Sequence, residues 1–154
     1  MALLGEEVEV IKLGTAFEAD PPGSRYCVMD YVNDPHAAAA ARTLAFNSSQ
    51  RQPAFAEALL ASLDGEDQTP PLMTYDISPP PPPGGRYIVL NYARHYPSRV
   101  AMRIYSLKVR DTDPDLATRL NDELQSTEDE FAEYVRSRIP KKKPRANAKK
   151  KGKS

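Results

Sequence analysis

The chain has 154 residues, of which 40% are apolar and 27% are charged, and this size suits one small domain followed by a tail. Its 21 basic and 21 acidic residues cancel overall, but residues 136–154 hold ten of the basic residues and no acid, so residues 1–135 carry a net charge of −10. This segregation excludes a uniformly basic, ribosomal-protein-like body and also a neutral enzyme with an unremarkable end.

The sequence shows no targeting or membrane-spanning segment. No apolar run approaches the roughly 18 residues that a membrane span needs. The first residues lack the basic and apolar regions of a signal peptide, and the early acids Glu6 and Glu7 argue against a transit peptide. A lone cysteine, Cys27, fits a reducing compartment. We therefore expect a protein of the cytoplasm or the nucleus.

Residues 6–46 predict two strands and only a marginal helix. Residues 6–17 fit a strand as well as a helix. Residues 25–32, rich in aromatic and β-branched side chains and preceded by a Pro-Pro-Gly-Ser turn, predict a strand. The five alanines of 37–41 favour a helix that is marginal by itself. Residues 43–46 continue this helix or form a short strand, and we favour the strand.

The middle of the chain gives clearer signals. A helix is predicted from Pro53 to Leu63, with an apolar face and with Gly65 ending it. Residues 72–77 predict a strand. Five prolines, 79–83, then form a loop that cannot belong to a central strand. Residues 86–92 are the strongest predicted strand of the chain.

The last part predicts a hairpin and then helices. Residues 95–98 are typical of a turn, and residues 100–107 favour an antiparallel partner for the preceding strand. A helix is predicted from Pro114, with leucines four residues apart. A second helical segment, 126–139, begins with a Thr127–Glu130 capping box.

Strands joined by short turns indicate an α+β fold with an antiparallel sheet of about four to five strands and helices on one face. The expected domain is an acidic unit, 1–139, with the proline loop at 79–83. Residues 140–154 have no large apolar side chain, so their composition predicts a disordered, lysine-rich tail.

The basic end is the most strongly specified feature of the sequence. Flexible cations bind polyanions by releasing condensed counterions, and RNA, DNA, acidic tubulin tails or anionic lipid surfaces carry suitable charge. A nuclear-import signal at 141–145 and a merely solubilising tail are the alternatives. The candidate nucleic-acid-binding residues are Arg136, Arg138, Lys141, Lys142, Lys143, Arg145, Lys149, Lys150, Lys151 and Lys153.

A second candidate surface is the predicted central hairpin, where tyrosines alternate with arginines. Such a platform could stack the bases of single-stranded nucleic acid. Burial of one sheet face explains the tyrosines more simply. The members of this set are Tyr87, Tyr92, Tyr96, Tyr105, Arg86, Arg94, Arg99 and Arg103.

No catalytic, metal or cofactor motif is present, so no cofactor and no metal site is predicted. The only residues that could form a nucleophilic pair are Cys27 with His36 or His95. Because Cys27 falls in a predicted strand, where a free cysteine behaves as a small apolar residue, we interpret it as structural. The proline run 79–83 could contact a profilin, SH3 or WW module, although a loop spacer is favoured.

Two family resemblances bear on the partner. Residues 1–4, the Gly23–Tyr26 approach to a strand and the lysine tail resemble the small Alu-RNA-binding subunits of the signal recognition particle, although the last helix here is acidic and the insertion at 33–85 is long. Residues 85–92 and 126–139 are similar to parts of actin-depolymerising-factor homology domains, but the long basic actin-contacting helix is missing. The first resemblance implies RNA binding and the second implies actin binding.

The sequence thus predicts a non-enzymatic interaction protein. Its acidic domain would dock a partner protein through the sheet or the acidic helix, and its tail would bind a polyanion, with RNA in a ribonucleoprotein complex as the expected case. The alternative is a cytoskeletal protein that binds actin or microtubules.

Overall fold

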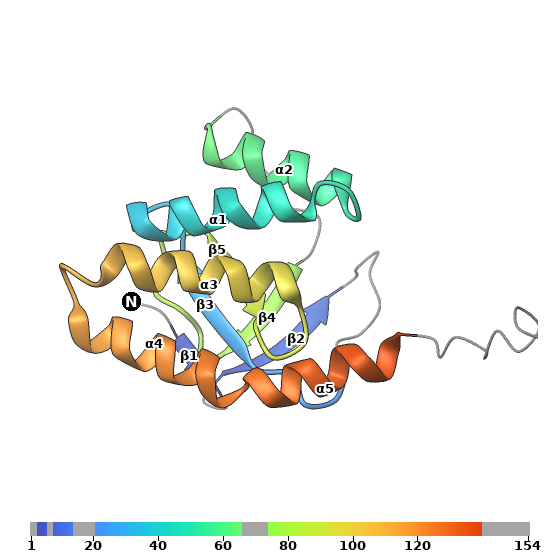
Figure 1. The fold of residues 1–154 in the computed structure, drawn as a ribbon. Helices are drawn as coiled ribbons and strands as arrows, with labels where there is room; N and C mark the ends of the chain where they lie inside the picture. The colour runs from blue at the N-terminus through green and yellow to red at the C-terminus, as the bar shows by residue number, and fades with distance from the viewer. Residues whose placement is uncertain (1–2, 6–7, 14–20, 66–73, 140–154) are drawn as a thin grey trace, which may run out of the picture.

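The computed structural model describes residues 3–5, 8–13, 21–65 and 74–139. These residues form ten elements, and Figure 1 shows their arrangement. In chain order they are β1 (Leu3–Gly5), β2 (Glu9–Leu13), β3 (Tyr26–Asp30), α1 (Pro35–Ser48), α2 (Pro53–Leu63), β4 (Thr74–Ser78), β5 (Tyr87–Asn91), α3 (Tyr96–Val109), α4 (Pro114–Ser126) and α5 (Glu128–Arg138).

The fold is α+β, as predicted. An antiparallel sheet has the strand order β1-β3-β5, and β2 pairs with β4 in a separate two-stranded sheet. The described strands are thus divided between two sheets, and a single sheet of four to five strands with helices on one face is not confirmed. Helices α1 and α3 lie side by side across the three-stranded sheet (Figure 1). Among the described helices, none has both the length and the apolar character needed to cross a membrane.

The β3–β5 pair has an internal two-fold relation. Val28 lies opposite Val89, and Tyr26 opposite Asn91. The hydrogen bonds at the two ends of the pair match: the Tyr31 amide donates to the Arg86 carbonyl over 2.9 Å, and the Tyr92 amide donates to the Arg25 carbonyl over 3.1 Å. A pseudo-two-fold axis therefore passes between the central valines.

The same relation is visible in the sequence. Residues 21–65 align with residues 82–126 without a gap, and each segment folds as a strand followed by two helices. Register, hydrogen bonds and sequence together identify an internal duplication. The identical positions are Pro21/Pro82, Pro22/Pro83, Gly23/Gly84, Arg25/Arg86, Tyr26/Tyr87, Val28/Val89, Tyr31/Tyr92, Ala40/Ala101, Arg42/Arg103, Pro53/Pro114, Ala56/Ala117, Leu59/Leu120 and Leu63/Leu124.

The short strand predicted at 43–46 is wrong, because α1 runs without interruption through these residues. The Asp34 side chain caps the helix by accepting hydrogen bonds from the amides of His36 and Ala37. The alanine run lies inside this helix, and Ala37, Ala40, Ala41 and Ala45 are fully buried. Packing against α3 and the sheet stabilises a helix whose alanine run is marginal alone.

The hairpin predicted from residues 100–107 is also wrong. These residues form the middle of α3, and the predicted turn at 95–98 is its first turn, with Pro97 near the helix start. The antiparallel partner of β5 is β3 instead. Ala101, Met102, Tyr105 and Val109 follow a helical spacing and are all buried, so tertiary packing overrides the β propensity of this segment.

Other predictions are confirmed. The strands at 25–32 and 86–92 correspond to β3 and β5, and the helix at 53–63 ends before Gly65, whose φ of 75° is left-handed. Within the strand predicted at 72–77, the structure describes residues from Thr74 onward, as β4.

The proposed capping box at the start of α5 is wrong. The Thr127 side chain makes no cap hydrogen bond; its hydroxyl lies instead 2.8 Å from the Glu123 carbonyl at the end of α4.

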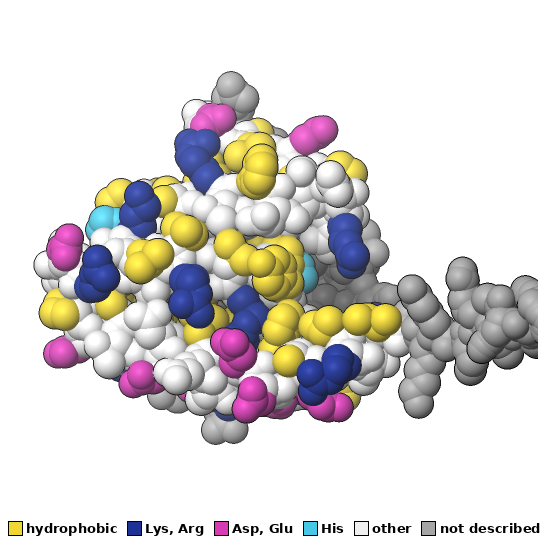
Figure 2. All heavy atoms as spheres, in the orientation of Figure 1, with side chains coloured by type: hydrophobic (Ala, Val, Ile, Leu, Met, Phe, Trp, Pro, Cys, Tyr) yellow, Lys and Arg dark blue, Asp and Glu magenta, His cyan; other side chains and the backbone are white. Residues whose placement is uncertain are grey.

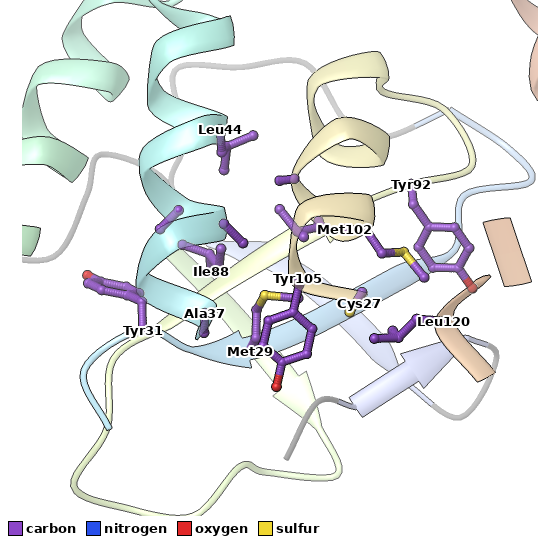
Figure 3. Close-up of a cluster of buried hydrophobic side chains, with 14 of the residues drawn as sticks. Cys27, Met29, Tyr31, Ala37, Leu44, Ile88, Tyr92, Met102, Tyr105 and Leu120 are labelled. Carbon is purple, nitrogen blue, oxygen red and sulfur yellow. The ribbon is translucent and has the colours of Figure 1, made fainter. Parts of the chain in front are cut away.

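The core lies between the sheet and the helices (Figure 3). The sheet contributes Cys27, Met29, Ile88 and Leu90 to this cluster, each at most 4% exposed. These residues alternate along β3 and β5 with Val28 and Val89, which are not in the cluster. The helix-facing side of the sheet is thus defined by one alternating set of residues.

Candidate nucleic-acid interface

The described part of the predicted interface is the C-terminal end of α5. This helix has acids in its first turn and Arg136 and Arg138 in its last turn, which is the favourable arrangement for the helix dipole. Both arginines are exposed. A guanidinium nitrogen of Arg136 lies 2.6 Å from the Glu133 carboxylate, and the Arg138 guanidinium carbon lies 5.4 Å from the centre of the Tyr134 ring.

The structure brings only these two predicted site residues together. The remaining ones lie outside the described residues, in the segment that follows α5, and they are Lys141, Lys142, Lys143, Arg145, Lys149, Lys150, Lys151 and Lys153.

Helix α5 is attached to the body by arginine–aromatic contacts. None of its residues is buried. The Arg99 guanidinium carbon lies 4.9 Å from the centre of the Phe131 ring, and that of Arg94 lies 4.9 Å from the Tyr134 ring. Arg94 also forms a 3.0 Å ion pair with Glu130. Two arginines of the second repeat therefore position the helix that leads into the basic end.

Arg99 is the central residue of this attachment. It is 9% exposed, and desolvation lowers its pKa. Its guanidinium donates hydrogen bonds to the Leu124 carbonyl over 2.7 Å, to the Tyr92 carbonyl over 2.8 Å and to the Thr127 hydroxyl over 3.0 Å. Arg99 thus satisfies carbonyls at the end of α4 and of the strand, and it presents its face to α5.

A second polar cluster, which the sequence did not predict, joins the sheet to α4. Arg25 forms a 2.9 Å ion pair with Glu123, and the Tyr92 hydroxyl donates to the same carboxylate. Burial raises the pKa of Tyr92, and its hydrogen bond with Glu123 raises it further. In the first repeat the equivalent pair is Tyr31 and Ser62, whose hydroxyl oxygens lie 2.9 Å apart. The two pairs occupy equivalent positions of the aligned repeats, but their contacts become evident only in the folded chain.

The tyrosine–arginine platform is not formed as predicted. Tyr92 and Tyr105 are 0% and 2% exposed, so neither ring is available to stack on a base. The Tyr105 hydroxyl instead donates to the Asp34 carboxylate over 2.6 Å. Tyr96 is 64% exposed and stacks on Phe131 of α5. Figure 2 shows basic and acidic side chains interspersed on the visible face, where apolar side chains also gather along α5.

Cys27 lies in the core, as interpreted. It is fully buried in β3, and desolvation raises its pKa to about 12. A reactive cysteine needs a lowered pKa and some exposure, so this thiol is poorly suited to act as a nucleophile.

His95 Nδ1 lies 2.8 Å from the Ser98 hydroxyl. The described ranges contain no group of three or more His, Cys, Asp or Glu side chains that could hold a metal ion.

The raised pKa of Cys27 predicts a loss of stability at alkaline pH. Its neutral thiol stabilises the fold fully below about pH 9, and this contribution is lost as the pH rises toward 12. Unfolding free energies measured between these limits should fall by about 1.4 kcal/mol per pH unit through this group. In Cys27→Val this contribution is absent, so its unfolding free energy should depend less steeply on pH over this range. Equal pH dependences for the two proteins would contradict the prediction.

Comparison with known proteins assigns no relative. The chain matches no known protein family, no curated protein sequence and no solved structure, so the two resemblances noted in the sequence gain no support, and the interface is interpreted from its own residues.

Proposed function

We propose that this chain is a non-enzymatic interaction protein: its acidic folded domain docks a partner protein, and its basic end, from Arg136 to Lys153, binds a polyanion, with RNA in a ribonucleoprotein complex as the expected ligand. The observation that carries the proposal is the segregation of charge. Ten basic residues and no acid follow position 135, whereas residues 1–135 carry a net charge of −10.

The structural support lies in the position of α5. Arg136 and Arg138 are exposed at the end of the helix from which the basic segment continues. Because the acids lie at the opposite end of the same helix, in its first turn, a polyanion that approaches the basic end meets less repulsion there than on the body. A polyanion held mainly by phosphate contacts would be bound with high salt dependence and little sequence preference.

The test is binding of a labelled single-stranded RNA by fluorescence anisotropy at several salt concentrations. A variant in which all the lysines of 141–153 are replaced by glutamine should bind at least about tenfold more weakly. The slope of log K against log salt should shrink by about 0.7 for each phosphate that the variant no longer neutralises. The matched lysine→arginine variant has the same length and charge and should bind like the natural chain.

Equal RNA binding by the glutamine variant would overturn the role of the basic end. The alternative cytoskeletal assignment is separated by treating the native complex with ribonuclease. Loss of co-sedimentation after treatment supports an RNA partner, and unchanged co-sedimentation with actin or microtubules contradicts it.

A further inference from the structure

The two repeats differ at the outer edges of their strands. In the first repeat β1 pairs with the outer edge of β3, with Leu3 opposite Val28, Leu4 opposite Cys27 and Gly5 opposite Tyr26. In the second repeat β5 is the last strand of the sheet order, so within the described residues no strand occupies the equivalent position. The internal symmetry thus identifies one filled and one open position for an added strand.

The hydrogen-bond pattern shows which groups of β5 face this open edge. Because the pairs Tyr31/Arg86 and Arg25/Tyr92 are hydrogen-bonded, Ile88 and Leu90 direct their backbone groups toward β3. The amides and carbonyls of the alternate residues, Tyr87, Val89 and Asn91, then point away from β3, and Val89 is the central one of the three. In β3 the residue equivalent to Val89 is Val28, which is the residue opposite Leu3 of β1.

Burial differs between the repeats in the same sense. Val28, with β1 beside it, is 1% exposed, whereas Val89 is only partly buried. The β5 edge strand has no charged residue, although charge is a common protection of exposed edges against pairing.

We propose that the outer edge of β5 binds an extended segment of a partner protein, which adds antiparallel to β5 as β1 adds to β3. The chemistry of the occupant follows from β1. Leu4 is 7% exposed and belongs to the core cluster, so the partner segment places a leucine-sized apolar side chain opposite Ile88. It places a second apolar residue opposite Val89 and a small residue opposite Tyr87.

This mode of recognition gains affinity from main-chain hydrogen bonds and specificity from alternate side chains. The inference rests on the partner-docking half of the proposed function and makes no use of the basic end. Docking through the sheet or the acidic helix is thereby narrowed to the outer edge of β5, to the register that β1 has on β3, and to an extended segment with apolar side chains.

The test uses a synthetic peptide with the sequence of residues 1–8 as the probe. We expect saturable amide shifts that centre on Tyr87, Val89 and Asn91 in an NMR titration of the full-length chain up to millimolar peptide. Val89→Pro removes an outward-facing amide and leaves the inward amides of Ile88 and Leu90 in place, so the fold should persist. This variant should bind the peptide at least about tenfold more weakly, and Val89→Ile should bind like the natural chain.

The peptide offers a matched pair of its own. In the β1 register Leu3 directs its backbone toward the receiving strand and Leu4 directs its backbone away. N-methylation of the first leucine should therefore abolish binding, and N-methylation of the second should be tolerated. A circular-dichroism melt of each protein variant verifies that it is folded.

Several results would overturn the proposal: no binding to the natural chain, equal binding by Val89→Pro, or shifts confined to β3, which would mean exchange with β1. Sedimentation that shows a dimer of the natural chain and a monomer of Val89→Pro would assign the edge to a second copy and would equally overturn it. RNA binding by Val89→Pro should remain unchanged, so failure here is distinguishable from failure of the basic end.

Discussion

Replacing Arg99 by methionine is expected to lower the free energy of unfolding by about 2–4 kcal/mol. The variant keeps most of the apolar stem but removes the guanidinium donor from the Tyr92 carbonyl, which lies 2.8 Å from it, and leaves that carbonyl without a donor. It also removes the 2.7 Å hydrogen bond to the Leu124 carbonyl, which keeps only the longer 3.2 Å bond from the Thr127 hydroxyl. A buried acceptor left without its donor costs about 1–3 kcal/mol. Denaturant unfolding followed by circular dichroism measures the change.

The same variant should loosen α5, because Arg99 also lies against the Phe131 ring. Amide exchange in α5 should then accelerate more than exchange in α1. The matched control is Arg103→Met, which removes an exposed arginine one turn further along the same helix and should change stability by no more than about 0.5 kcal/mol. A similarly small effect for Arg99→Met would refute the attachment described above.

Strands β3 and β5 and helices α2 and α4 can be predicted from the sequence because local signals and packing agree there. Turn residues bound both strands, and α2 and α4 each carry apolar residues at helical spacing after a proline in the first turn. Where local propensity and tertiary packing favour the same structure, the secondary structure of a segment can be predicted from that segment alone.

Helices α1 and α3 cannot be predicted from their local sequences, because each helix depends on packing against the other. The residues around Val100 have β propensity, and the alanine run alone does not make a stable helix. The duplication would have resolved both, because residues 98–109 align with the alanine-rich 37–48 and two aligned segments are expected to share one secondary structure.

The candidate site was only partly readable from sequence. The charge segregation that points to the basic end is a property of composition and was evident at once. The roles of Arg25 and Arg99 depend on contacts with Glu123 and Leu124, far along the chain, and no local pattern reports such contacts. The open edge of β5 needs the strand order, which becomes visible only when β1 is seen beside β3.

The duplication also shows where the two halves have diverged toward different tasks. Arg99, which positions α5, aligns with Ala38 in the first repeat, where no corresponding fifth helix follows α2 among the described residues. Glu123, the partner of Arg25, aligns with Ser62. Arg99 and Glu123 thus have no charged counterpart in the first repeat, whereas β1 lies on the edge of the first repeat and no described strand lies on that of the second.

The aligned leucines test whether the two repeats form one cooperative domain. Leu59 of α2 and Leu120 of α4 are both 0% exposed and belong to the same core cluster. Substitution of either one by alanine should cost about 2–5 kcal/mol, from lost burial and the cavity that remains. Because α1 and α3 pack against each other across the axis, each variant should shift one common transition, with the midpoints of circular dichroism and tyrosine fluorescence coinciding.

The control is Leu60→Ala in α2, which truncates a 37% exposed leucine and should lower the free energy of unfolding much less. Two separated transitions in Leu59→Ala, with the second unchanged from the natural chain, would mean that the repeats fold independently.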